Sequence, residues 1–374
     1  MSIATTEDQR DIQESIRSWV ASAEPIGTLR ADEQASWRAQ WAGLAGLGVF
    51  SVAVPESAGG AGGTVADLAA MLEATAAGLV GGPVLTTALA AIVVGSVRSA
   101  EELCEGRMPC AAVLSGDPVR AAADGDDLVA DGIVELAVGA VDGAAVLLPV
   151  LREGVNGGDI VWCMVQADTP GLEIEPSIGV DRSVPLGRVT LDAVRIAPGS
   201  QLPGVRTDFV HDLAAALASA EAAGVAGRCL DIAVEHARTR VQFGAPIGSF
   251  QAIKHLCADM LCRVEKARAV AWDAAVAVDS APIELPLSAG VAGALALDAA
   301  VDTAKDCIQI LGGIGFTWEH DAHLYLRRAL VLRQVLGGST RWRARAADAA
   351  RRGVRRTLTV DLGEAELLRD TVRD

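Results

Sequence analysis

The chain has 374 residues and a formal net charge of −16 at pH 7; 51% of its residues are hydrophobic and only 3% are aromatic. A chain of this length can form two or three domains around an ample apolar core, and its wealth of alanine and leucine favours helix over strand. The acidic balance argues against a nucleic-acid partner, because phosphate binding needs clustered lysine and arginine.

The seven cysteines show neither a C-x-x-C pair nor the spacing of metal ligands. We therefore expect buried free thiols, no metal site and a reducing, cytoplasmic location. The apolar run 213–227 is interrupted by Glu221 and by glycines. It predicts a packed helix rather than a membrane span, and the N-terminal residues do not resemble a secretory signal.

Residues 1–108 are predicted to form an N-terminal helical domain. Their first amphipathic run places Ile12, Ile16 and Val20 on one face, with charged residues elsewhere. Two apolar helical runs follow, at 65–79 and 81–96.

Residues 109–203 change character and predict a middle β domain. Short runs rich in valine and isoleucine are bounded by Gly, Asp, Asn and Pro, as is typical of strands in a small barrel or sandwich. These runs are 111–116, 127–138, 144–151, 159–167, 172–177 and 187–198.

Residues 204–374 return to long helices and predict a C-terminal helical bundle. The clearest helix begins at Gln251, with an apolar stripe at helical spacing. A linker at 279–288 separates it from a helix expected at 288–311, which Gly312 and Gly313 end, because glycine accepts the left-handed conformation of a helix terminus. The basic run 341–356 is interpreted as a solvated helix face.

Two segments carry most of the information about function: RVQFGAPIGSFQAIKHLCADM (240–260) and QILGGIGFTWEHDAHLYLRRA (309–329). Together, and after a helical and then a β region, they resemble the acyl-CoA dehydrogenase family. The resemblance covers almost the whole chain. It implies an α+β, mainly α, acyl-CoA dehydrogenase fold, with an N-terminal helical domain, a middle β domain and a C-terminal four-helix bundle.

The resemblance further implies that these two segments bind the FAD of a neighbouring subunit. Arg240 and Gln242 would address the pyrophosphate, because a guanidinium offers a planar fork of donors to phosphate oxygens and an amide can both donate and accept. Phe243 would pack at the flavin end. The remaining predicted cofactor residues are Phe250, Gln251, Gln309, Gly312 and Gly313, whose glycines allow close backbone approach.

The chain departs from the family where it would hold a flavin of its own. The family's Gly-rich loop with Thr, Ser and Asp is replaced by AAVLSGDPV (111–119), and the family's Trp-Ile-Thr/Ser run by Leu136, Ala137 and Val138. The hydroxyl donors that would hold a flavin ring are therefore missing.

The family's catalytic carboxylate is missing as well. The chemistry needs one glutamate to remove the α-proton of an acyl thioester, and its two family positions correspond to Ala214 and Leu336 here. The family's basic substrate-binding residue corresponds to Ala215. Glu221 lies seven residues beyond Ala214, about 10 Å along a helix, and is either a displaced base or a polar residue on a packed helix.

These features favour the non-catalytic subunit of a heteromeric acyl-CoA dehydrogenase, similar to the actinobacterial heterotetramers that act on steroid side-chain CoA thioesters. Its partner would be a competent dehydrogenase subunit in an α2β2 heterotetramer, and electron-transfer flavoprotein would be the acceptor. Two alternatives stay open: a self-sufficient homotetramer that uses a base such as Glu221, and a scaffold protein without flavin. The acyl group is not defined by the sequence.

Overall fold

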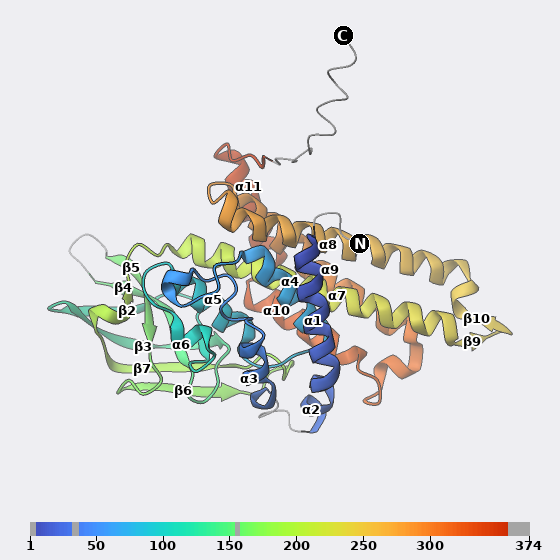
Figure 1. Ribbon diagram of the computed structural model, residues 1–374, viewed down its shortest axis with the longest axis horizontal. Helices are drawn as coiled ribbons and strands as arrows, with labels where there is room; N and C mark the ends of the chain where they lie inside the picture. Colours follow the sequence, from blue (N-terminus) through green and yellow to red (C-terminus); the bar gives the residue numbers. More distant parts are fainter. Residues whose placement is uncertain (1–4, 32–36, 154–157, 358–374) are drawn as a thin grey trace, which may run out of the picture.

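The computed structural model describes residues 5–31, 37–153 and 158–357. Within them, α-helices at the N-terminus precede an eight-stranded sheet, and a bundle of long helices follows (Figure 1). The expected fold class, an α+β and mainly α acyl-CoA dehydrogenase fold, is confirmed. Helix gives way to strand between Cys104 and Cys110 and returns after Leu202. The domain borders at 108 and 203 stay a prediction.

The N-terminal helices begin where the sequence supplies caps. The hydroxyl of Thr6 accepts from the amide of Gln9, and Thr64 pairs with Asp67 in the same way, so each forms a reciprocal capping box. The helical elements are α1 Glu7–Ala23, α2 Pro25–Ala31, α3 Arg38–Gly46, η1 Glu56–Ala58, α4 Val65–Ala77, α5 Val84–Gly95 and α6 Glu101–Cys104. Helices α4 and α5 are the two apolar runs expected from the sequence, and both are almost wholly buried.

The sheet is mixed, with strands in the order β6-β7-β3-β1-β4-β5-β8 and with β2 paired to both β3 and β4. Its strands are β1 Cys110–Ala112, β2 Val119–Asp124, β3 Asp127–Val138, β4 Ala145–Arg152, β5 Asp159–Val165, β6 Leu172–Ser177, β7 Leu186–Ile196 and β8 Gln201–Leu202. Pairing is antiparallel except for β1–β4 and β2–β4. Strand β2 was not predicted, because its alanines have little intrinsic strand preference and its pairing with β3 and β4 makes it a strand.

The bundle consists of α7 Thr207–Thr239, α8 Gln251–Ser280, α9 Leu285–Leu311, α10 Ala322–Val335 and α11 Gly338–Arg351. Shorter elements join them: η2 Pro198–Ser200 before α7, β9 Val241–Gln242, β10 Ala245–Pro246 and η3 Ile247–Ser249 before α8, and η4 Gly312–Phe316 before α10. Helix α8 begins at the expected residue. Helix α9 begins three residues before the expected 288, because a proline within the first helical turn is tolerated.

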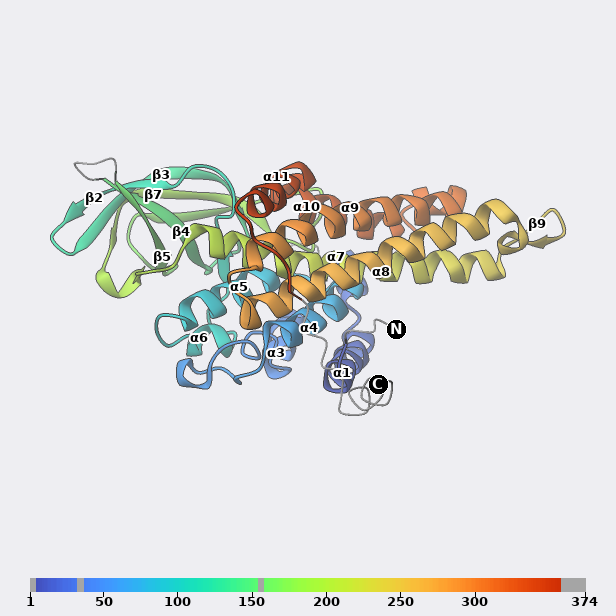
Figure 2. The same ribbon diagram turned by 90° about the horizontal axis from the view of Figure 1, so that it is seen from above.

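Helices α7 and α9 form the centre of the molecule. Both are long and apolar enough to cross a membrane, but 89% of the apolar window in Thr207–Thr239 and 67% of that in Leu285–Phe316 is buried by other parts of the chain. Burial of this kind is typical of core helices, in agreement with the packed helix expected at 213–227. Together with α8 they extend beyond the sheet and the N-terminal helices, and the β9–β10 hairpin lies at the far end (Figures 1 and 2).

Candidate functional site

A tight hairpin occupies the far end of the bundle. Strands β9 and β10 are joined by Phe243 and Gly244, whose φ angles of 52° and 78° are both left-handed, as a two-residue hairpin turn of type I′ requires. Glycine accepts this conformation freely, whereas phenylalanine is strained in it. The amide of Ile247 donates to the carbonyl of Arg240 at 2.8 Å and closes the base of the hairpin. The corner is therefore a defined structure rather than a loose loop.

The predicted cofactor residues of this corner are all exposed: Arg240, Gln242, Phe243, Phe250 and Gln251. Phe243 is 93% exposed and meets the ring of Phe250 edge-on, with 6.1 Å between centroids. No hydrogen bond or ion pair involves the side chain of Arg240 within the described residues. The guanidinium of Arg240 and the rings of Phe243 and Phe250 are thus available to a ligand or to another chain.

The second predicted segment lies at the same end of the bundle, where α9 stops short of the hairpin (Figure 2). Gln309 is exposed on the last turn of α9, and Gly312 and Gly313 are exposed directly after it. Gly312 has a φ of 65°, and nothing lies within 4 Å of where its Cβ would be. The backbone here is open to close approach from outside.

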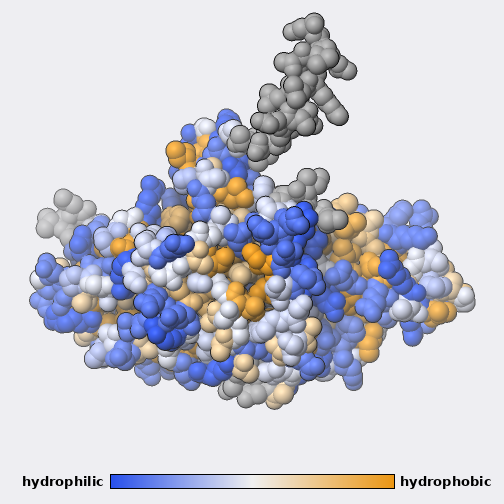
Figure 3. Space-filling model, in the orientation of Figure 1, coloured by the Kyte–Doolittle hydropathy of each residue, from blue (hydrophilic) through white to orange (hydrophobic). Residues whose placement is uncertain are grey.

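Exposed aromatic side chains gather in these two segments. Among the described residues, the only large aromatics that are substantially exposed are Phe243, Phe250, Phe316 and Trp318. Apolar side chains reach the surface of the protruding end among hydrophilic ones (Figure 3). Exposed apolar groups of this size usually mark a binding surface.

The corresponding site within the same chain is closed. Ala137 and Val138, at the end of β3, are buried, and Leu136 is half-buried. At Gly139 a Cβ would lie 2.2 Å from Oγ1 of Thr86, so the end of β3 packs directly on α5. A flavin ring has no space between these elements.

The two positions predicted to match the family's catalytic glutamate are also buried in packed surroundings. Ala214 and Ala215 are completely buried on α7, and Leu336 is 2% exposed at the end of α10. The cavity beside Leu336 has a volume of about 20 Å³ and is otherwise lined mainly by apolar residues of α5, α7 and α10. Pockets for small molecules are typically some 300–1,000 Å³, so this cavity cannot hold an acyl thioester.

Glu221 lines the same cavity and is held in a buried ion pair. It is 1% exposed, and its Oε2 accepts from Nη2 of Arg328 at 3.1 Å. Burial raises the pKa of its carboxyl, and the guanidinium of Arg328 opposes that rise. Arg328 was not among the predicted site residues, although its spacing from Tyr325 and Leu332 places it on the buried stripe of α10.

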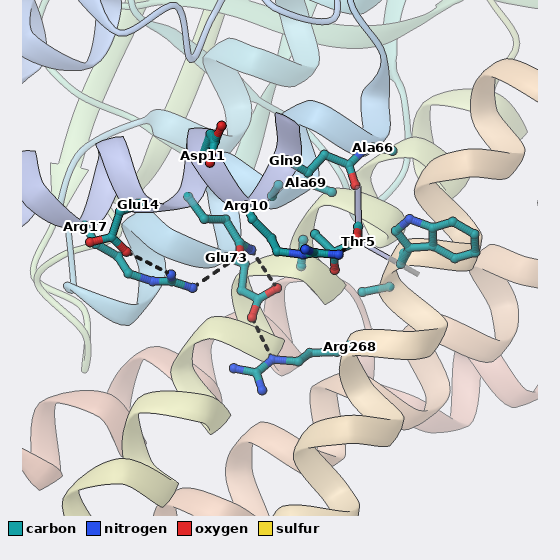
Figure 4. A pocket seen from close by; sticks show the side chains of 15 residues that line it. Thr5, Gln9, Arg10, Asp11, Glu14, Arg17, Ala66, Ala69, Glu73 and Arg268 are labelled. Carbon is teal, nitrogen blue, oxygen red and sulfur yellow. Dashed lines mark hydrogen bonds and ion pairs between the residues drawn. The ribbon is translucent and has the colours of Figure 1, made fainter. Parts of the chain in front are cut away.

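A further hollow lies beneath α1. It measures about 390 Å³, with alanines on its floor and charged residues of α1, α4 and α8 on its walls (Figure 4). Its innermost charged groups bind each other: Arg268 donates to Glu73 at 2.7 Å and to Glu265 at 2.9 Å. Within the described residues, no group of three or more His, Cys, Asp and Glu side chains could hold a metal ion.

FAD therefore fits one half of the predicted site and not the other. The exposed corner offers a cation, amides, aromatic rings and open glycine backbone to a dinucleotide held by a second chain. Between β3 and α5, where the family resemblance would place this chain's own flavin ring, the side chains are closely packed.

Comparison with known families agrees with the fold. Residues 6–114 match the family described as "Acyl-CoA dehydrogenase, N-terminal domain", and residues 212–350 match "Acyl-CoA dehydrogenase, C-terminal domain". Acyl-CoA dehydrogenase FadE34 of Mycobacterium tuberculosis is 44% identical over the whole chain. The chain spans only about half of that relative, 52% of its length. IpdE2 of the same organism is 34% identical over 88% of this chain and 93% of its own length.

Solved structures give the same assignment. A Tcur3481–Tcur3483 steroid ACAD variant superposes with a TM-score of 0.83 at 27% identity, over 93% of this chain and 98% of that chain. The ChsE4–ChsE5 complex of Mycobacterium tuberculosis superposes with a TM-score of 0.81 at 25% identity, over 95% and 99% respectively. The chain belongs to the acyl-CoA dehydrogenase family, whose cofactor is FAD.

Proposed function

We propose that this chain is the non-catalytic subunit of a heteromeric acyl-CoA dehydrogenase. It lends FAD-binding residues to the active site of a competent partner and lacks a catalytic glutamate of its own. The observation that carries this proposal is an asymmetry: the predicted donor residues are all exposed, whereas the cavity at Leu336 is only about 20 Å³.

The similar proteins support a heteromer. Two of the structures that superpose are described by pairs of unlike names, ChsE4–ChsE5 and Tcur3481–Tcur3483, and the second is called a steroid ACAD. FadE34 is about twice as long as the region that it shares with this chain, so it has room for a second unit of similar size. We propose by analogy an α2β2 heterotetramer and a CoA thioester of a steroid side chain as substrate.

In this proposal the reaction is the α,β-desaturation of an acyl-CoA thioester. A glutamate of the partner removes a proton from the α-carbon. FAD, when bound, would supply the acceptor for the hydride of the β-carbon, so that loss of both hydrogens leaves a C=C bond. Arg240 neutralises the pyrophosphate, Gln242 and Gln251 hydrogen-bond the cofactor, and Phe243 shields its flavin end from water. Electron-transfer flavoprotein is the proposed acceptor, and the cytoplasm the proposed location.

The absorption spectrum tests whether the chain binds FAD alone or only together with its partner. We expect the chain expressed alone to be nearly colourless, and the chain co-purified with its partner to carry about one FAD per pair of unlike subunits. Stoichiometric yellow flavin in the chain alone would favour a self-sufficient enzyme. A colourless complex would favour a scaffold without flavin.

Arg240→Ala tests the donor role. A charge-assisted hydrogen bond at a partly buried interface contributes about 1.5–3 kcal/mol, so the Kd of FAD for the apo-complex should rise about 10- to 100-fold. Gln251→Ala and Gln309→Ala remove neutral contacts of ~1 kcal/mol and should cost less. Each value comes from a fluorescence titration of apo-complex with FAD.

Arg206→Ala is the matched control. Arg206 is also an exposed arginine beside α7, but it precedes the first turn, and the 33 residues of the helix separate it from Arg240 by roughly 50 Å. FAD affinity should be unchanged in this variant. Equal loss in both variants would indicate a general electrostatic effect and contradict a direct contact at Arg240.

A further inference from the structure

Arg328 is a fully buried cation that joins three separate parts of the chain. From α10 it donates to Oε2 of Glu221 on α7 at 3.1 Å and to Oγ of Ser183 between β6 and β7 at 2.8 Å. It also reaches the carbonyl of Val80, between α4 and α5, at 3.5 Å. The side chains of Arg328 and Glu221 are 2% and 1% exposed, so the ion pair is inaccessible to water.

The loop that carries Ser183 is fixed by hydrogen bonds to Asp181 and to Gly82. The amide and the hydroxyl of Ser183 both donate to Oδ1 of Asp181, at 2.9 and 2.7 Å. The hydroxyl proton is thus committed to Asp181, and the oxygen is left to accept from Arg328. The carbonyl of Ser183 accepts from the amide of Gly82 at 2.9 Å. The sheet loop, the N-terminal helices and the bundle therefore meet at one guanidinium.

The ion pair also borders the small cavity beside Leu336. Glu221 and Arg328 line the 20 Å³ cavity together with Leu336, which stands at one of the family's positions for the base. Glu221 Oε1 and Arg328 Nε are buried without a partner among the described residues. A cavity of this size accommodates about one water molecule, which these two atoms could bind, but it excludes an acyl chain.

We propose that the Glu221–Arg328 ion pair closes this chain's own acyl pocket and ties together the three parts of the chain that meet there. The proposal deepens the proposed function, and it rests on that function because the closed space is the half-site that a catalytic subunit would use. Arg328 has a structural role in this proposal and touches neither the substrate nor the cofactor of the partner's site.

The first test is a double-variant cycle on the full chain. Arg328→Met and Glu221→Leu each leave one buried charge without its partner, so each should lower Tm by roughly 5–10 °C. The double variant Glu221→Leu/Arg328→Met replaces both charges with apolar groups and should recover most of that loss. If the Tm of the double variant falls by the sum of the two single losses, Glu221 and Arg328 do not stabilise each other.

The second test asks whether the pocket opens. Glu221→Ala/Arg328→Ala removes both side chains, and apolar cavities of about 150 Å³ are known to accept small apolar ligands. Calorimetric titration with octanoyl-CoA should detect no binding to the wild-type chain and micromolar binding to this variant. Glu221→Ala/Arg328→Met retains more packing, and it is titrated instead if the alanine pair does not fold. If the folded variant does not bind octanoyl-CoA, the ion pair is not what closes the pocket.

The wild-type chain separates failure of this inference from failure of the proposed function. Octanoyl-CoA binding by a colourless wild-type chain would overturn the closed pocket alone. Binding together with stoichiometric FAD and turnover would overturn both. In the complex with the partner, Glu221→Leu/Arg328→Met should retain turnover per bound FAD within about twofold, because the active glutamate belongs to the other subunit.

Discussion

Leu336, which the sequence analysis matched to one position of the family's catalytic glutamate, contributes to packing in this chain. Its side chain is buried, and its carbonyl accepts from the indole of Trp342 at 3.1 Å, which fixes the turn between α10 and α11. The two residues that follow, Gly337 and Gly338, have φ angles of 80° and 73°, so the turn keeps its shape without a carboxylate. The position is a structural one in this chain.

Leu336→Glu should therefore fail to create an active enzyme. The 20 Å³ cavity leaves no room for substrate, and an ionised carboxylate buried in it should cost on the order of 3 kcal/mol of unfolding free energy. Urea denaturation and dye-reduction assays of the chain alone measure the two effects. Leu336→Met, which conserves volume, should cost less than about 1.5 kcal/mol. Turnover by the glutamate variant would show that the pocket opens to substrate.

At the scale of elements, α7 connects the sheet to the exposed corner. Its first turn is held by Trp162 of β5, whose indole donates to Oγ1 of Thr207 at 3.1 Å. One turn later, Nδ1 of His211 lies 3.0 Å from Nη2 of Arg341. Arginine can only donate, so this contact requires a neutral imidazole at His211. Burial, followed by the charge of Arg341, lowers the pKa of His211 to about 4.

The stability of the chain should consequently fall in mild acid. The unfolded state takes up a proton at His211 near pH 6.5, but the folded state does so only near pH 4. Folding is therefore disfavoured as the pH falls through this window, by at most ~3 kcal/mol. His211→Gln should lose less stability than the wild type between pH 7 and 4 in urea titrations, whereas exposed His255→Gln should match the wild type. Parallel curves for all three proteins would contradict this role for His211.

The sequence predicted those helices and strands whose apolar residues follow a clear pattern along the chain. The apolar periodicity of 65–79 and 81–96 predicted α4 and α5, and Val-rich runs predicted strands such as β3. Strand β2 was missed because its residues have little strand preference without β3. The roles of Arg240 and its neighbours stay a prediction from family resemblance. The closed cavity and the Arg328 contacts could not be predicted, because they join residues more than one hundred positions apart.

On the scale of the whole molecule, the two ends of the chain's long axis differ in what they offer to a partner. On the described strands of the sheet, the exposed large apolar side chains are Ile133 and Ile160, at 59% and 44%. At the bundle end, Phe243 and Phe316 are 93% and 78% exposed, beside the segments predicted to bind FAD. Aromatic anchors of this kind typically dominate the binding energy of an interface. The bundle end is therefore the predicted surface for the competent subunit.

Phe243→Ser and Phe316→Ser should each weaken assembly with that subunit about 10- to 100-fold, since truncating an aromatic anchor typically costs about 2 kcal/mol or more. Both side chains are exposed in the chain alone, so its Tm should change by no more than about 2 °C. Ile133→Ser is the control, because it removes an exposed apolar side chain from the sheet end and should leave assembly intact. Analytical ultracentrifugation of the mixed subunits measures the Kd of each variant. If Ile133→Ser dissociates the complex while the two phenylalanine variants assemble normally, the partner binds the sheet, and the exposed corner cannot be the part that reaches its FAD.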